Sequence, residues 1–363
     1  MTPDYPTPPD SRLPTPPDAP LPLLTADIEG VDGHVREVPE DFRVEEVPAY
    51  APEGRGHHLF VRFEKTALTT PEAVRRIASA LGVDPGEAGW AGLKDRNAVT
   101  TQWASFAGAD AQVALSATVE GIRVLDAVPH GNKLRTGHLK ANRFEVRIAG
   151  AAPGFDVART ILDRLERSGM PNYFGEQRFG HQGRNIGDAR RWLIAGGRAP
   201  RGRFERKLLV SVLQAMLFND VLANRMRDGL FETAVAGDLL RKEETGGLFV
   251  TADLDEAQSR TVAWEVSPTG PMFGDKMRWP EAEALAREEA VLSRWELQKT
   301  DLRRFAKYGE GTRRVLRVRP AEVDLTREQD ALRLRFVLPK GAFATMVLRE
   351  LLRSSRGGPL PLA

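Results

Sequence analysis

Hydrophobic and polar positions alternate along the first part of the chain, as in β-strands. Leu59, Val61 and Phe63 recur at every second position, and Phe63 lies between the charged residues Arg62 and Glu64. Period-two alternation is typical of strands with one buried face. Strand-like runs of this kind occur at 42–47, 59–63, 100–107, 121–128, 143–149 and 332–338. We therefore expect β-sheet towards both ends of the chain.

Helical spacing follows the second of these runs. Val74, Ile77 and Leu81 recur at helical intervals, after Pro71 at a first-turn position and before Gly82. Proline inside the start of a helix and glycine past its end are standard helix boundaries. Further helices are expected to end at Gly169 and to span 206–226, 280–297 and 343–352.

Strand signals at both ends and helix signals in the middle are expected when one domain is inserted into another. The periodicity breaks at 172–175, where we place the first crossing between domains. We expect a discontinuous domain formed by 30–170 and 300–355, and an inserted domain formed by 172–299.

Composition narrows the class of protein. The 363 residues are enough for about two domains, and the absence of cysteine excludes disulfides and thiolate-bound metals. Nine of the 25 prolines lie within 1–22, so we expect a disordered Pro-rich tail at 1–25. The chain shows no long apolar run and no secretory signal, so we expect a cytoplasmic protein without membrane contact.

Charge is distributed unevenly although the net charge is only +2. Residues 1–60 carry 12 acids against 4 Lys and Arg. Two windows are strongly basic: 172–207 has 9 Lys and Arg against 3 acids, and 302–319 has 7 against 1. Concentrated positive charge favours a polyanionic partner such as RNA, although solvated basic faces would give the same counts.

Common cofactor and hydrolase signatures are absent. The sequence contains no GxxxxGK[ST], GxGxxG, HExxH or GxSxG motif, and its six histidines lack ligand spacing. We therefore expect no metal and no cofactor.

The segment 90–103 holds the most unusual chemistry, because Asp95 lies between Lys94 and Arg96 on a loop that enters a strand. Flanking cations favour an ionised carboxylate, which suits a nucleophile or a base. A structural aspartate that caps a turn is the alternative from this pattern alone.

Five segments stand out along the chain: PEDFRVEE at 39–46, AGLKDRNAVT at 91–100, KANRF at 140–144, PNYFGEQRFG at 171–180 and LPKGAFAT at 338–345. They resemble motifs of the tRNA pseudouridine synthase D (TruD) family and occur in the family's order. The resemblance covers about 33–353. It implies an α/β (α+β) fold: a pseudouridine synthase catalytic domain with a largely antiparallel mixed sheet, interrupted by an inserted α/β TRUD domain.

The same resemblance assigns site residues. It implies that Asp95 is the catalytic carboxylate and that Phe144 stacks on the target uracil. Asn142 and Lys94 would support the site. Where family members usually carry lysine, three residues before Pro39, this chain has Arg36, which would pair with the aspartate.

The function implied is isomerisation of one uridine of tRNA, uridine 13 in the D-stem region, by a monomer without cofactor. The cations expected to contact RNA are Arg96, Lys140, Arg178, Arg184, Arg313 and Arg314. Two other interpretations stay open. One is a non-catalytic protein that binds structured RNA, and the other is a metal-dependent nuclease, which the lack of further suitably flanked acids disfavours.

Overall fold

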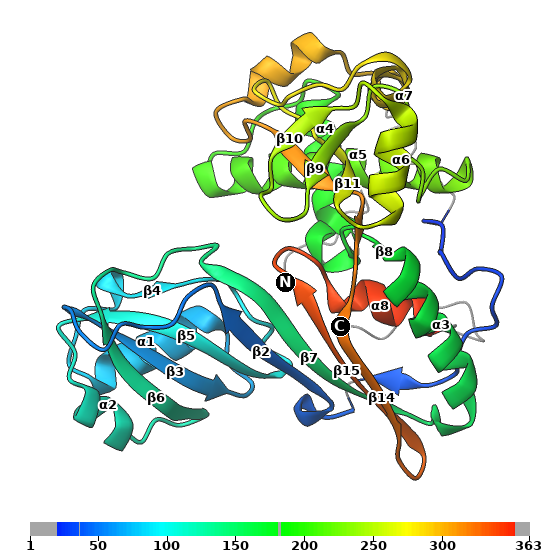
Figure 1. Cartoon of the computed structure of the whole chain (residues 1–363). Coiled ribbons are helices and arrows are strands. Elements are labelled where there is room, and N and C mark those ends of the chain that lie inside the picture. Colours follow the sequence, from blue (N-terminus) through cyan, green and yellow to red (C-terminus); the bar gives the residue numbers. More distant parts are fainter. Residues whose placement is uncertain (1–19, 36, 181–182, 353–363) are drawn as a thin grey trace, which may run out of the picture. The chain divides into compact units, whose positions relative to one another are not determined.

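The computed structural model describes residues 20–35, 37–180 and 183–352. Residues 1–19 of the expected Pro-rich tail therefore lie outside the described residues. At its end, the expectation of disorder up to residue 25 is wrong, because Thr25 is fully buried and its Oγ1 donates to a carboxylate oxygen of Glu350 at 2.7 Å. Contacts divide the chain into two compact units, one of Thr25–Met170 with the chain from Val318 onward, and one built mainly of Pro171–Arg317. We describe each unit by itself (Figure 1).

The larger unit is built on a mixed sheet. Among the described residues it has nine strands in the order β14-β15-β7-β2-β5-β3-β6, with β1 beside β7 and β4 beside β5. Only the β2–β5 pairing is parallel; the others are antiparallel. The strands are β1 (His34–Val35), β2 (Phe42–Pro48), β3 (His58–Lys65), β4 (Gly89–Trp90), β5 (Val99–Ala107), β6 (Ile122–His130), β7 (Leu139–Ala149), β14 (Ala321–Arg327) and β15 (Ala331–Pro339).

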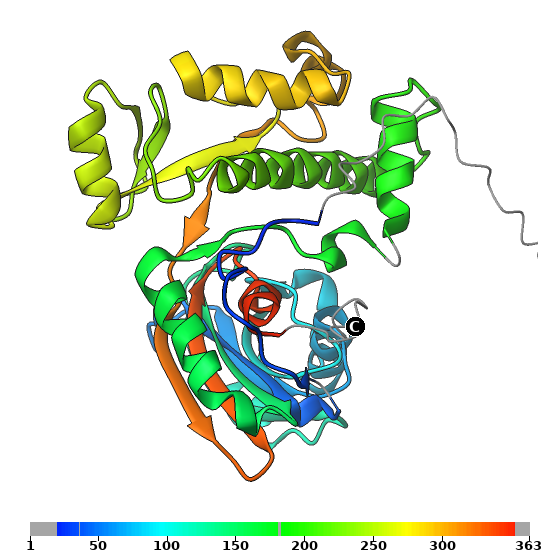
Figure 2. The ribbon, with the colours of Figure 1, turned by 90° about the vertical axis from the view of Figure 1, so that its right-hand side faces the viewer.

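Helices pack against this sheet, because their apolar stripes bury the apolar side chains that alternate strand positions place on one face. Leu59, Val61 and Phe63 of β3 are buried in one cluster with Val74 and Ile77 of the first helix. Figure 2 shows α3 beside α8, next to β14 and β15. The helices of this unit are α1 (Thr70–Ala80), α2 (Ala111–Ser116), α3 (Phe155–Ser168) and α8 (Ala344–Leu351).

The smaller unit combines a sheet with helices around one long helix. Its antiparallel sheet has the order β10-β9-β11-β12, and β8 pairs with β13 where the chain enters and leaves. Helix α4 packs against α5, and α7 lies along it (Figure 2). The elements are β8 (Met170–Pro171), α4 (Arg184–Leu193), α5 (Arg203–Arg227), β9 (Leu239–Lys242), β10 (Leu248–Val250), α6 (Leu254–Val262), β11 (Val266–Met272), α7 (Ala282–Arg294), β12 (Thr312–Val315) and β13 (Arg317–Val318).

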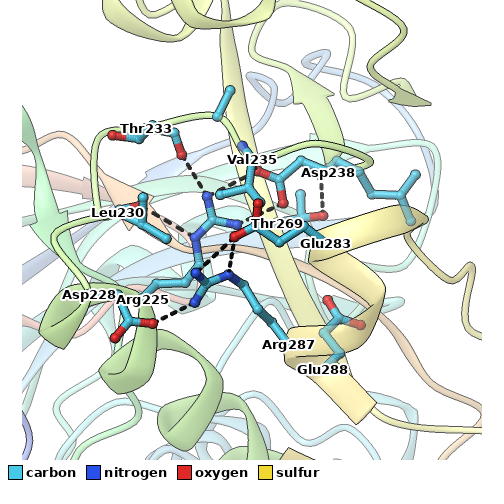
Figure 3. A network of polar contacts seen from close by, with 12 residues as sticks. Arg225, Asp228, Leu230, Thr233, Val235, Asp238, Thr269, Glu283, Arg287 and Glu288 are labelled. Carbon is cyan, nitrogen blue, oxygen red and sulfur yellow. Dashed lines mark hydrogen bonds and ion pairs between the residues drawn. The ribbon is translucent and has the colours of Figure 1, made fainter. Parts of the chain in front are cut away.

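A buried ion pair ties the end of α5 to the loop that follows. Arg225 is bidentate to Asp238, at 2.7 and 3.0 Å, and also donates to the carbonyl of Thr233 (Figure 3). Both charged side chains are almost fully buried. A buried charge is stable only when it is paired and hydrogen-bonded. This network therefore fixes the path of the chain between the end of α5 and the start of β9.

The expected elements are confirmed, and the limits of the units are refined. The helix expected at 206–226 is α5, and that at 280–297 is α7. The chain leaves the smaller unit at Arg317, not near residue 300. The segment after 300 belongs there because Leu302 and Phe305 join its core and β12 pairs with β11.

Candidate active site

Asp95 lies on the loop between β4 and β5 of the larger unit. Its side chain is half-buried, and its Oδ1 accepts a hydrogen bond of 3.0 Å from the main-chain N–H of Asn97. This is the bond of an Asx turn, in which a carboxylate orders its own loop. It holds the carboxylate in one orientation relative to the backbone of the loop.

A buried lysine from the neighbouring strand anchors the same loop. Nζ of Lys65, at the end of β3, donates to the main-chain oxygen of Asp95 at 2.8 Å and to that of Leu68 at 2.6 Å. Burial lowers the pKa of Lys65 to about 8, although the negative charge of Asp95 opposes that shift. Lys65 is thus a desolvated cation close to the candidate carboxylate.

Lys94 does not flank Asp95 in the way its sequence position suggested. Its Nζ forms an ion pair with Glu46 at 2.9 Å and donates to Oδ1 of Asn142 at 2.9 Å. The side chains of Lys94 and Glu46 are 6% and 1% exposed. The ammonium of Lys94 therefore reaches β2 and β7, which carry Glu46 and Asn142.

The backbone of this loop is also bound to the start of α1. The N–H of Lys94 donates to Oγ1 of Thr70 at 2.9 Å, and that hydroxyl donates to Oε1 of Gln102 on β5 at 2.9 Å. Thr70 and Gln102 are both fully buried. The loop that carries Asp95 is therefore held by α1, β3 and β5 together.

Phe144, on β7, packs within an aromatic cluster that it forms with Phe42 of β2 and Phe336 of β15. Its ring stacks on that of Phe336 with centroids 5.2 Å apart, and meets the edge of Phe42 at 6.2 Å. Phe144 is only 7% exposed. Asn142, two residues earlier on the same strand, points to the same face of the sheet, so Phe144 follows the Lys94–Glu46–Asn142 cluster along β7.

The other predicted residues of the larger unit lie at its surface or outside the description. Arg96 is exposed, and its Nε donates to the carbonyl of Ala67 at 3.2 Å. Lys140 is exposed at the start of β7. Arg36 lies outside the described residues, so its pairing with Asp95 stays a prediction.

Two predicted cations of the smaller unit share one aromatic ring. The guanidinium of Arg314 lies 4.2 Å and that of Arg178 5.7 Å from the ring centroid of Phe174. Arg314 also donates to the carbonyl of Asn172 at 3.1 Å. Burial, together with the charge of Arg178, lowers the pKa of Arg314 to about 10. Burial lowers the pKa of Arg178 as well. Two cations so close together favour an anion beside them.

The prediction of an RNA contact at Arg313 does not fit the structure. Its side chain is 2% exposed and forms a bidentate pair with Glu288 of α7, at 2.7 and 2.9 Å. Adjacent residues of a strand point to opposite faces, so Arg313 faces the core when Arg314 faces Phe174. Arg184, at the start of α4, is exposed.

Sequence reasoning missed two residues of the site. Glu46 lies within the segment 39–46 that resembles a family motif, so that segment was the available signal. Lys65 carried no such signal, because a lysine at the end of a strand is normally solvated.

Within 20–35, 37–180 and 183–352, no cluster of three or more potential metal ligands occurs. No helix in these ranges is both long and apolar enough to span a membrane.

Comparison with known proteins identifies the fold and then the family. A solved structure of a putative tRNA pseudouridine synthase D from Methanosarcina mazei matches with a TM-score of 0.74 at 20% identity, covering 92% of this chain and 96% of that one. This chain therefore shares the fold of that putative pseudouridine synthase. The family model tRNA pseudouridine synthase D (TruD) matches residues 21–189 and 204–351.

Close relatives carry the same description. The chain is 49% identical to a tRNA pseudouridine synthase D of Anaeromyxobacter sp. (strain Fw109-5), over 94% of this chain and 98% of the relative. It is 42% identical to a tRNA pseudouridine synthase D of Thermus thermophilus, over 92% of each chain. The chain belongs to the TruD family and is an enzyme of the isomerase class.

Proposed function

We propose that this protein converts one uridine of tRNA to pseudouridine, at position 13 by family resemblance, with Asp95 as the reacting carboxylate. The observation that carries the proposal is the anchoring of the Asp95 loop by Lys65, Thr70 and the Asn97 turn. A fixed carboxylate costs little reorganisation when a substrate arrives.

The reaction is balanced within the substrate. The C1′–N1 bond breaks, the uracil rotates, and a C1′–C5 bond forms; C5 loses its proton to solvent and N1 gains one. An ionised Asp95 could attack the sugar, attack the base or remove the 2′ proton, and these routes stay open. The target nucleotide must first leave its stack, which costs a few kcal/mol.

Neighbouring residues have distinct proposed roles. Lys94, held by Glu46, positions Asn142 through the 2.9 Å hydrogen bond and keeps the amide in one orientation. Phe144 offers the flipped uracil a ring already supported by Phe336. Arg36 takes the place of the family's lysine near Asp95.

We assign RNA binding to cations that can meet a phosphate. These are Arg96, Lys140 and Arg184 at the surface, and the Arg178–Arg314 pair beside Phe174. We propose that the protein acts on tRNA in the cytoplasm as a monomer, without cofactor.

Release of tritium from tRNA labelled with 5-³H-uridine tests the function, because only loss of the C5 proton gives it. The wild-type protein should release tritium in excess EDTA, and Asp95→Asn should release none while binding tRNA within a few-fold. A passive RNA-binding protein would bind without release. A metal-dependent nuclease would cut the RNA and lose that activity in EDTA.

A further inference from the structure

A hollow of about 560 Å³ opens in the smaller unit at the start of α5. It is lined by Arg203, Phe204, Lys207, Lys307, Tyr308, Gly309 and Glu310. The lining residues 203–207 belong to the basic window 172–207, and the lining residues 307–310 belong to the basic window 302–319. All of these residues are distant in sequence from Asp95, and the site described above uses none of them.

Phe204 is exposed to an unusual degree for a phenylalanine. It is 81% exposed, although the next turns of α5 bury Leu209 and Val210 completely or nearly so. A single exposed apolar residue needs no explanation, but an exposed ring at the rim of a hollow does.

A second ring of the hollow is held rigidly. The hydroxyl of Tyr308 accepts a hydrogen bond of 2.9 Å from Arg206, and its ring meets that of Trp192 at 6.0 Å in an edge contact. Arg206 also donates to the carbonyl of Pro200 at 2.5 Å. The ammonium of Lys307 lies 5.1 Å from the Tyr308 ring centroid. Tyr308 is therefore a preorganised aromatic wall.

The hollow is positively charged. Arg203, Lys207 and Lys307 line it and are exposed. Glu310 is the acid of its lining, and its carboxylate is paired with Lys276 at 2.8 Å. Three cations therefore face a single acid that is already compensated.

We propose that this hollow binds one unstacked nucleotide of a single-stranded RNA segment, with its base against Phe204 and Tyr308 and its phosphates on Lys207 and Lys307. Aromatic faces beside cations are the chemistry that recognises unpaired nucleotides, because every nucleotide has a base with a π-face and a negatively charged phosphate. Base-paired RNA would offer the rings only its backbone. The inference rests on the proposed function, in which this single-stranded segment is part of the tRNA substrate.

Binding of a fluorescently labelled single-stranded RNA dodecamer to the full chain tests the proposal. Phe204→Ala should weaken binding by about 5- to 160-fold, the loss expected for one stacked base, and Phe204→Trp should retain it. Val262→Ala is the matched control, because Val262 is 66% exposed on α6 of the same unit and does not line the hollow. This control should bind like wild type.

Three outcomes would overturn the proposal: unchanged affinity of Phe204→Ala, equal binding of the same sequence as a duplex, or equal binding of an acidic peptide of matched charge. Tritium release, measured in parallel, separates the two proposals. If wild type releases tritium and Phe204→Ala binds the dodecamer normally, only the proposed role of the hollow is refuted. If wild type releases no tritium but Phe204→Ala weakens binding of the dodecamer, only the proposed isomerase function is refuted.

Discussion

Nζ of Lys65 donates a 2.8 Å hydrogen bond to the main-chain oxygen of Asp95, joining residues on β3 and on the loop before β5. The lysine is 1% exposed, so this bond forms in a desolvated environment where it is stronger than in water. It makes the position of the candidate carboxylate depend on a residue that does not itself need to touch substrate.

Lys65→Met should lower turnover more than tRNA affinity, because it frees the Asp95 loop without removing a phosphate contact.

The pKa of Lys65 is about 8 in the folded chain against an ordinary 10.5. Between these values the unfolded chain binds more protons, so the stability of wild type relative to Lys65→Met should rise with pH, with a slope approaching about 1.4 kcal/mol per pH unit. Urea unfolding of both proteins across this range checks the sign. A difference independent of pH would contradict it.

Glu46→Gln should destabilise the fold and lower turnover, since it leaves the ammonium of Lys94 buried without its counter-charge. Removing one partner of a buried pair typically costs about 3–5 kcal/mol. The double variant Glu46→Gln with Lys94→Met should recover part of that stability, because no lone charge remains. Recovered stability without recovered turnover would show that the pair also positions Asn142. Strictly additive losses would refute the coupling.

Phe144→Leu separates a base-stacking role from a packing role. Phe144 and Phe336 stack on each other and are both buried, so Phe336→Leu is a control with a similar packing loss. If Phe144 contacts the uracil, Phe144→Leu should reduce kcat well beyond Phe336→Leu at equal loss of thermal stability. Matched kcat values in the two variants would assign Phe144 to the core alone.

Arg178→Gln should weaken tRNA binding and flatten the dependence of log affinity on log salt by up to about one unit, as expected for one lost phosphate contact. Arg313→Gln should leave that slope unchanged and instead lower stability, because Glu288 loses its bidentate partner. Salt titrations and thermal unfolding of both variants check the contrast. The opposite assignment of the two effects would place Arg313, not Arg178, on the RNA.

The sequence by itself determined the elements and the family. Alternation at Leu59, Val61 and Phe63 predicted β3, and helical spacing from Val74 predicted α1, because period and capping are local properties of the chain. The ordered motifs around Asp95 and Asn142 likewise need only the sequence.

Tertiary structure alone decided the partners of charged side chains. Lys94 pairs with Glu46 rather than with its neighbour Asp95, and Lys65 approaches Asp95 from another strand. Arg313 is buried while Arg314 stacks on Phe174, although the two are adjacent in the sequence. Which cation meets which carboxylate depends on strand register and on which face is covered. Both are set by packing between segments distant in sequence, so counts of charge along the chain cannot provide them.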